Sequence, residues 1–393
     1  MNGQRVALGA AAGWQEGLYR RLHENPELSM AELETGAEIA RCLESLGYEV
    51  QRIGGGVVGV LRNGDGPTVL FRADIDALPV QEATGLPYAS KRPGVMHACG
   101  HDIHIVCALG AAEVLAGSRD TWAGTYIALF QPGEETAEGA RAMVADGLVD
   151  RVPRPDVALA QHVLTAPVAG KVATAPGPVL SAGDSIRITI HGQGSHGSMP
   201  HLGVDPVVIA AAVVLRLQTI VSRVLAPDEF GVVTVGSVQA GAKSNIIPAE
   251  ATLLVNTRAY DEHVRDRILE AVERMVRAEC AASGATQEPT FEFYDQFPMT
   301  DNDAAVTARV RAALEGGLGA DRVEDLPRIP ASEDFSVIPD AFDVPYTYWG
   351  LGGFTAGQTP LPNHNPGFAP AIQPTISTGT EAAVIAALAW LGK

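Results

Sequence analysis

The sequence contains the segment Met96-His97-Ala98-Cys99-Gly100-His101-Asp102-Ile103-His104, which continues directly into an apolar stretch at 105–115. A thiol, several imidazoles and a carboxylate therefore stand close together in the chain. Thiolate sulfur and neutral imidazole nitrogen are ligands of zinc and similar divalent ions. The segment predicts a metal site. The alternative is that Cys99 is a small core residue and that the histidines lie at the surface or behind the groups that bind a ligand.

An acidic motif follows in Phe130-Gln131-Pro132-Gly133-Glu134-Glu135. It comes after β-prone residues 125–130, so we predict a strand that carries two adjacent carboxylates on the turn at its end. Neighbouring side chains on extended backbone point to opposite sides. One glutamate can therefore bind a metal while the other faces a substrate as a base. An exposed acidic turn is the alternative interpretation.

Together with Phe71-Arg72-Ala73-Asp74-Ile75-Asp76-Ala77-Leu78-Pro79, these motifs resemble the M20 metallopeptidase family. The similarity is to its amidohydrolase branch, which includes hippurate hydrolases, N-acyl-amino-acid deacylases and auxin-conjugate hydrolases. It continues in the family's order through Gly194-Ser195-His196-Gly197, Asn245-Ile246-Ile247-Pro248, Ser332-Glu333-Asp334-Phe335 and His364-Asn365-Pro366. The resemblance covers nearly the whole chain and implies a metal-dependent amidohydrolase.

Composition limits the classes of partner. A chain of 393 residues with 46% apolar and 19% charged residues is typical of a globular protein of about two domains. Its formal net charge of −18 argues against nucleic acid and against an anionic membrane surface as partners. We expect a small-molecule substrate.

The cysteines and the N-terminus indicate the compartment. Cys42, Cys99, Cys107 and Cys280 are far apart and lack the density of a disulfide framework. The N-terminal residues are too weakly apolar for a signal peptide, and the apolar stretch at 207–217 is too short to span a bilayer. We therefore expect a cytoplasmic protein.

The first part of the chain alternates strands and helices, which predicts a mixed or parallel sheet covered by helices. Expected helices lie at 14–23, 29–47, 102–115 and 136–146, and expected strands at 48–53, 57–61, 68–71 and 157–161. Ser29 and Glu32 form a capping-box pattern at the start of the second helix. The last of these strands would deliver His162 at its end.

A second pattern begins after a Pro/Gly/Ser-rich connection at 174–183. A strand, a helix, two strands, a helix and a strand are expected at 185–191, 205–223, 232–238, 251–258, 262–282 and 290–294. This order suits a ferredoxin-like α+β sandwich with both helices on one face. We predict an α/β fold in which a mixed-sheet di-metal hydrolase domain (1–182 and 295–393) is interrupted by an inserted domain (183–294). The resemblance implies that the insert is a lid and dimerisation domain of a homodimer.

The resemblance also implies the ligands of a two-metal centre, in which Cys99 bridges the ions. The implied ligands are Cys99, His101, Glu135, His162 and His364. These donors suit Zn²⁺ and leave Mn²⁺, Co²⁺ and Ni²⁺ open. Metal-bound imidazoles usually donate their second N–H to a carboxylate or carbonyl, so Asp76 and Asp102 are candidate partners.

The remaining histidines are less informative. His97 and His104 fit a structural role as well as a functional one. His23, His191 and His263 are interpreted as ordinary histidines.

Glu134 is the predicted general base, which takes a proton from a metal-activated water and returns it to the leaving amine. His196 matches the family histidine that reaches in from the partner subunit's inserted domain to stabilise the oxyanion. An exposed hairpin histidine is the alternative, and His201 is a nearby competitor. Asn245 and Arg258 are candidates for binding a substrate carboxylate, although a surface salt bridge is also consistent with Arg258.

The predicted reaction is hydrolysis of N-acyl or N-aroyl amino acids to a carboxylic acid and a free amino acid. An M20-type dipeptidase or a carbamoyl-amino-acid hydrolase is the alternative within the class. A thiol hydrolase with Cys99 as nucleophile would leave Glu134 and Glu135 without a role, and a non-enzymatic binding module would not explain Glu134 beside a complete ligand set. Gly133 and Thr136 depart from the family, where Ala and Gly are more frequent.

Overall fold

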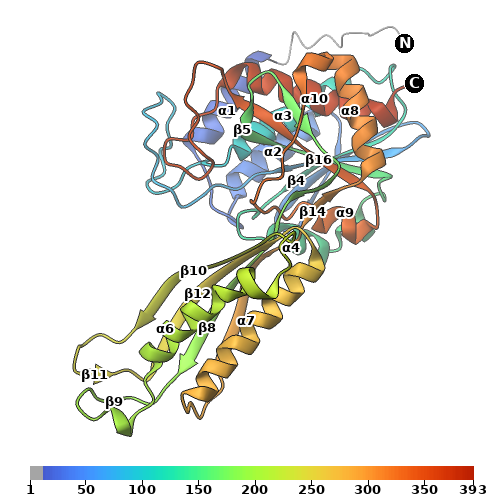
Figure 1. The fold of residues 1–393 in the computed structure, drawn as a ribbon. Coiled ribbons are helices and arrows are strands. Elements are labelled where there is room, and N and C mark those ends of the chain that lie inside the picture. The colour runs from blue at the N-terminus through green and yellow to red at the C-terminus, as the bar shows by residue number, and fades with distance from the viewer. Residues whose placement is uncertain (1–11) are drawn as a thin grey trace. The chain divides into compact units, whose positions relative to one another are not determined.

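The computed structural model describes residues 12–393, which divide into two compact units. The first unit comprises residues 12–179, Thr300–Arg328 and Asp334–Lys393, and the second comprises Leu180–Met299 and Ile329–Glu333 (Figure 1). The chain therefore leaves the first unit and returns to it. The lid and dimerisation roles expected for residues 183–294 stay predictions.

The first unit is built on an eight-stranded sheet with the order β1-β2-β4-β3-β5-β16-β6-β15. Its strands are β1 (Glu49–Ile53), β2 (Gly56–Asn63), β3 (Thr68–Asp74), β4 (Gly124–Gln131), β5 (Val157–Val168), β6 (Val172–Thr174), β15 (Val323–Asp325) and β16 (Tyr346–Phe354). β3 runs parallel to β4 and β5, and β16 parallel to β5, whereas β2 pairs antiparallel with β1 and β4. The predicted mixed α/β fold is confirmed. β7 (Gly177–Leu180) and β14 (Thr300–Asn302) form a separate two-stranded sheet.

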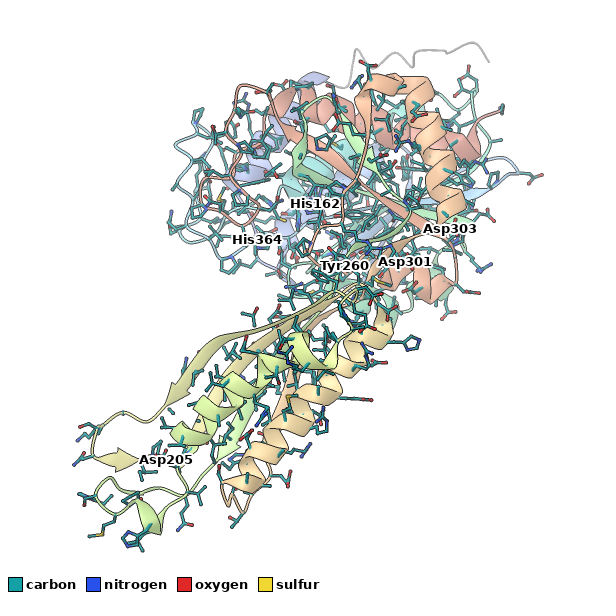
Figure 2. All side chains as sticks on the ribbon, viewed as in Figure 1. His162, Asp205, Tyr260, Asp301, Asp303 and His364 are labelled. Atoms are coloured by element: carbon teal, nitrogen blue, oxygen red, sulfur yellow. The ribbon has the colours of Figure 1, made fainter. Side chains whose placement is uncertain are left out.

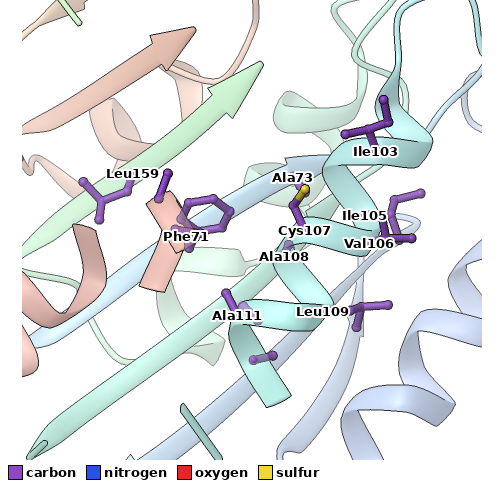
Figure 3. Packing of buried hydrophobic residues seen from close by; sticks show 14 of the residues in the cluster. Phe71, Ala73, Ile103, Ile105, Val106, Cys107, Ala108, Leu109, Ala111 and Leu159 are labelled. Carbon is purple, nitrogen blue, oxygen red and sulfur yellow. The ribbon is translucent and has the colours of Figure 1, made fainter. Parts of the chain in front are cut away.

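The helices of the first unit are α1 (Ala12–Glu24), α2 (Leu33–Ser45), α3 (His101–Gly117), α4 (Gly139–Ala145), α5 (Leu148–Arg151), α8 (Ala304–Leu318), η3 (Ala320–Arg322), α9 (Val337–Phe342) and α10 (Ile372–Leu391). α3 is the central one. It is apolar on all sides and buried over most of its length, as expected for a helix inside a core. Figure 3 shows Cys107 and Ala108 of α3 beside Phe71 and Ala73 of β3. The core thus fixes the start of α3, where His101 lies, relative to the end of β3.

The second helix starts later than predicted. α2 begins at Leu33, and its N-cap residue Glu32 makes no side-chain cap bond. Instead Ser29 Oγ donates to Asp76 Oδ2 at 2.7 Å, and Glu32 Oε1 accepts from the Gly133 N–H at 2.8 Å. The capping-box prediction was wrong because both side chains bind residues that are distant in sequence.

Two other boundaries differ from the prediction. β5 continues to Val168, so His162 lies within a strand and not at its end; Gly350 of β16 is its neighbour in the sheet. The helix predicted at 136–146 begins only at Gly139. The preceding residues form a turn, in which Ala137 N–H donates to Glu134 O at 2.9 Å.

The second unit contains a four-stranded antiparallel sheet with the order β10-β12-β8-β13. Its elements are β8 (Ala182–His191), β9 (Ser195–His196), η1 (Pro200–Leu202), α6 (Pro206–Leu217), η2 (Ile220–Val224), β10 (Gly231–Ala240), β11 (Ile246–Ile247), β12 (Glu250–Ala259), α7 (Glu262–Ala282) and β13 (Thr290–Phe297). The strand and helix order is the predicted one. Alternating residues of β8, including Ile186 and Ile188, share a core with Ile209 of α6 and Ile268 of α7. One face of the sheet is therefore covered by the two long helices.

None of the helices among residues 12–393 is long and apolar enough to cross a membrane.

Candidate metal centre

The predicted metal-binding residues collect beside the central parallel strands. Asp76 follows the end of β3, Glu134 and Glu135 follow the end of β4, and His162 lies on β5. Because β4, β3 and β5 are neighbours in the sheet, their side chains meet at one edge, the usual place for a binding site in an α/β sheet. His101, the first residue of α3, lies beside them.

The structure brings the five predicted ligands together. Cys99 Sγ lies 3.4 Å from His162 Nε2, and Glu135 Oε2 lies 3.2 Å from His364 Nε2. His101 Nε2 lies 3.8 Å from Glu135 Oε1. Figure 2 labels His162, which comes from β5, and His364, which comes from the segment after β16. Cys99, Glu135 and His364 form one group of potential ligand atoms within 4.8 Å of one another.

Two buried polar atoms indicate that a cation fits here. His101 Nε2 and Glu135 Oε1 have no hydrogen-bond partner among the described residues. Buried polar atoms are rarely left unpaired in folded proteins, because an unsatisfied group costs about 1–3 kcal/mol. A divalent ion between the two atoms would satisfy both.

The electrostatic surroundings favour positive charge. Hydrogen bonds with Cys99 and Glu135 raise the pKa of His364 to about 10. Burial opposes charge on His101, but Asp74, Asp76 and Cys99 together raise its pKa well above the ordinary value. The same anionic groups would stabilise a bound divalent cation. A site with a surplus of anionic donors is therefore matched to metal ions.

Asp76 fixes the orientation of two predicted ligands. His101 Nδ1 lies 2.9 Å from Asp76 O and 3.1 Å from Asp76 Oδ1, which leaves Nε2 free to bind a metal. Asp76 Oδ2 accepts from the Glu135 N–H at 3.0 Å and from Ser29 Oγ at 2.7 Å. Burial opposes ionisation of Asp76, but the bonds from His101, Ser29 and Glu135 lower its pKa.

Asp102 differs from its predicted role. Its Oδ2 pairs with His23 Nδ1 at 2.7 Å, and its Oδ1 accepts from the Ile103 N–H at 2.9 Å. Among the described residues, Asp102 forms no hydrogen bond with a predicted metal-binding imidazole. As the second residue of α3, it is directed toward α1, whereas His101 is directed toward Asp76.

Sequence reasoning missed the network behind the ligands. Asp74 Oδ2 pairs with Arg72 Nη1 at 2.7 Å, and Asp74 Oδ1 lies 2.5 Å from His104 Nδ1. His104 Nε2 accepts from the Val163 N–H at 2.8 Å, so the ring proton is on Nδ1 and His104 is a neutral donor to Asp74. His104 therefore holds the backbone beside His162. Because residues three apart on a helix face the same side, the spacing of His101 and His104 could have indicated that His104 lies on the same side of α3 as the predicted ligand.

The Ser332-to-Phe335 motif supplies a counter-ion to this network. Asp334 Oδ1 lies 3.2 Å from Arg72 Nη2 and accepts from Gln131 Nε2 at 2.5 Å. Arg72 also donates to Gln131 Oε1 at 2.8 Å. A buried arginine thus has acidic partners on both sides, which is the condition under which a buried charge is tolerated.

Asn363 is a further contact that the sequence did not reveal. Its Nδ2 lies 3.3 Å from Cys99 O, 3.4 Å from Val163 O and 3.6 Å from Cys99 Sγ. It therefore links the segment that carries His364 to the cysteine and to the strand that carries His162. No residue spacing signals such a contact, since the partners are far apart in the chain.

The predicted base Glu134 is buried beside the ligands. Its Oε2 lies 4.0 Å from His101 Nε2. The preceding Gly133 has φ +53, and a Cβ there would lie 2.5 Å from Met30 Sδ. The positive φ of the turn favours glycine at this departure from the family pattern, whereas the flexible Met30 side chain could move aside.

The other predicted site residues belong to the second unit. His196 is exposed on β9, which pairs with β11, and Gly197 N–H donates to Asn245 O at 2.8 Å, so His196 and Asn245 are neighbours. Arg258 on β12 donates to Asn256 Oδ1 at 2.9 Å and binds Ser332 Oγ. It forms no ion pair with any residue in the described chain, in contrast to the surface salt bridge considered above. Their action together with Glu134 stays a prediction.

Comparison with known proteins identifies the family of the chain. The sequence model of peptidase family M20/M25/M40 matches residues 70–387. The chain belongs to this family. The prediction of an M20-type metal-dependent amidohydrolase is thereby confirmed.

Similar relatives include an N-acetyl-L-cysteine deacetylase of Bacillus subtilis, 35% identical over 341 residues (86% of this chain and 80% of the relative). The IAA-amino acid hydrolase ILR1-like 4 of Arabidopsis thaliana is 33% identical over 342 residues (86% and 77%). Among solved structures, the Bacillus subtilis YXEP protein, described as a dinuclear metal binding peptidase from the M20 family, has a TM-score of 0.79 and 29% identity, with coverage of 96% of this chain and 98% of that chain.

Replacing Asp76 should weaken metal binding. In Asp76→Asn, the acceptor that orients His101 and binds the Glu135 N–H is changed, so we expect metal affinity to fall by about 10–100-fold. Competition with a chromophoric chelator measures the affinity, and Asp65→Asn, an exposed aspartate of the same unit, is the matched control. Unchanged affinity in Asp76→Asn would contradict the role given to this side chain.

Proposed function

We propose that this protein hydrolyses the amide bond of N-acyl or N-aroyl amino acids and releases a carboxylic acid and a free amino acid. The observation that carries the proposal is the convergence of the five potential ligands beside the buried Glu134 in a chain of the M20/M25/M40 family. Relatives named as a deacetylase of N-acetyl-L-cysteine and as a hydrolase of an amino-acid conjugate support this substrate class.

The proposed cofactor is a pair of divalent ions, with Zn²⁺ favoured by the thiolate and imidazole donors and Mn²⁺, Co²⁺ and Ni²⁺ left open. Cys99 Sγ lies 3.4 Å from His162 Nε2 and within 4.8 Å of ligand atoms of Glu135 and His364, which supports its predicted bridging position. The neighbour described as dinuclear supports the same number of ions. When bound, such ions would acidify a water molecule and polarise the substrate carbonyl.

The protein side chains would carry the proton and hold the substrate. Glu134 would accept a proton from the attacking water and donate it to the leaving amine, which a single carboxylate can do in successive steps. His196 would donate to the oxyanion from the partner subunit. Arg258, whose hydrogen-bond partners within residues 12–393 are Asn256 and Ser332, would bind the carboxylate of the amino acid with Asn245 nearby. Burial lowers the pKa of Arg258 but leaves it charged at neutral pH.

The same proposal includes a homodimer formed through the second unit. α6 carries no charge before Arg216, yet Val208 and Leu215 are 63% and 73% exposed. Exposed apolar residues of this kind are typical of an interaction surface. β10 is an edge strand of the four-stranded sheet, and an unpaired edge invites pairing with a second chain. A second copy would cover both and would bring its own His196, as the mechanism requires.

We place the protein in the cytoplasm. All four cysteines are free in the structure, and a reduced Cys99 is needed as a metal ligand. A reducing compartment meets this requirement.

The substrate class is tested by amino-acid release from N-acetyl, N-benzoyl and long-chain N-acyl amino acids, with dipeptides and N-carbamoyl amino acids as the competing classes. Dipeptides are included because a relative 35% identical over 361 residues is named thermostable carboxypeptidase 2. We expect turnover of N-acyl amino acids that is lost on chelation and restored by Zn²⁺ or Mn²⁺. In Glu134→Gln, kcat should fall by at least about 10²–10⁴-fold with metal content unchanged.

Preferred cleavage of dipeptides or carbamoyl compounds would replace the proposed substrate class. Activity that survives verified metal removal would contradict the mechanism and favour Cys99 as a nucleophile.

The dimer is tested with Leu215→Glu. A charge on the exposed apolar surface of α6 should shift the protein from dimer to monomer in sedimentation velocity and reduce kcat, because His196 would no longer reach the partner's site. Arg223→Glu, a charge change on the neighbouring η2, is the control for added negative charge. A wild-type protein that sediments as an active monomer would refute the proposed dimer.

A further inference from the structure

A buried histidine outside the ligand set lies between two carboxylates. The side chain of His23, near the end of α1, is 1% exposed. Its Nδ1 lies 2.7 Å from Asp102 Oδ2, and its Nε2 lies 3.4 Å from Glu82 Oε1. Carboxylates only accept hydrogen bonds, so both ring nitrogens must carry protons and the ring is an imidazolium. The interpretation of His23 as an ordinary histidine does not account for this arrangement.

The imidazole ring of His23 is enclosed by other side chains of the protein and is not solvated. The rings of Tyr19 and Tyr88 each lie 5.6 Å from the His23 ring, and His97 is the other titratable group nearby. Burial lowers the pKa of His23, but its bonds to Asp102 and Glu82 outweigh this effect and raise the pKa to about 9. The imidazolium is thus the buried counter-ion of both acids at neutral pH.

One of these acids, Asp102, lies in the first turn of α3. Asp102 follows the predicted ligand His101 in the chain, and its second carboxylate oxygen accepts from the Ile103 N–H at 2.9 Å. Its position in the first turn also places a negative charge at the positive end of the helix. Holding Asp102 therefore holds the turn from which His101 extends.

The other acid, Glu82, precedes a residue that contacts the segment carrying His364. Glu82 Oε2 accepts from the Ser90 N–H at 2.6 Å, which fixes the carboxylate within an irregular loop. The adjacent Ala83 N–H donates to Pro366 O at 2.8 Å. The His364 N–H donates to Ala98 O at 2.8 Å, and the contact of Ala83 with Pro366 is a further restraint on the same segment. The side chain of His364 itself is 54% exposed, so its position depends on how this segment is held.

We propose that His23 is a positioning residue that joins the two sides of the metal centre, the His101 side through Asp102 and the His364 side through Glu82. This inference rests on the proposed metal centre. It predicts that loss of the imidazolium loosens His364 and His101 even in a folded protein, because two buried carboxylates would then face each other without a counter-ion.

The test is metal binding by His23→Gln. We expect Co²⁺ and Zn²⁺ affinities to fall by about tenfold or more, and the Co²⁺ absorption bands, which report the ligand geometry, to change in position or intensity. In the double variant His23→Gln/Glu82→Gln, one of the facing charges is removed, so part of the lost affinity should return. Circular dichroism shows whether each variant is folded at the temperature of the binding experiment.

Gln15→Leu is the matched control. Gln15 lies on the same helix and binds Val106 O at 2.8 Å and Thr380 Oγ1 at 2.9 Å, so its loss disturbs packing against α3 and α10 without touching Asp102 or Glu82. It should lower stability and leave the Co²⁺ spectrum unchanged. If His23→Gln does not fold, Glu82→Gln alone serves as the test, with the same expected spectral change.

Failure of the proposed function can be distinguished from failure of the role proposed for His23. A wild-type protein that binds no divalent ion would overturn the proposed function together with this inference. Wild-type metal affinity and an unchanged Co²⁺ spectrum in folded His23→Gln, or in Glu82→Gln where that variant is the test, would overturn the inference alone. Equal spectral changes in Gln15→Leu would do the same, because the effect would then be general to α1.

Discussion

The Asp76 carboxylate is the interaction on which the arrangement of this site depends. It is bound by the imidazole of His101, by the backbone of Glu135 and by the hydroxyl of Ser29, which come from three segments distant in sequence. One side chain therefore fixes the first residue of α3 relative to the turn after β4. This constraint also explains the local sequence before α2, where Ser29 serves Asp76 instead of capping a helix.

Charge balance explains why so many acids are buried together. Two unit charges about 4 Å apart interact by about 4 kcal/mol at an effective dielectric constant of 20, so unneutralised carboxylates could not be packed at these distances. Arg72 neutralises Asp74 and Asp334, and His23 neutralises Asp102 and Glu82. Glu135 has His364 beside one carboxylate oxygen and the orphaned Nε2 of His101 near the other, where the proposed divalent ions would supply the positive charge.

The sequence predicted the chemistry better than the contacts. The resemblance to a family implied the ligand set, and periodicity indicated the order of strands and helices along the chain, because apolar alternation is a local feature. The roles of His23, Asn363 and Glu32 could not be predicted, since each depends on a partner that only the tertiary fold brings near. The end of β5 was misplaced for a similar reason: its extension past His162 depends on pairing with β16.

The most direct test of the central claim is an anomalous-scattering experiment on crystals of the metal-loaded protein, with data collected on both sides of the absorption edge of the metal. We predict two peaks about 3.5–4 Å apart, a separation typical of two-metal hydrolases. Both peaks should lie among the side chains of Cys99, His101, Glu135, His162 and His364. A single peak, or peaks away from Cys99, would contradict this prediction.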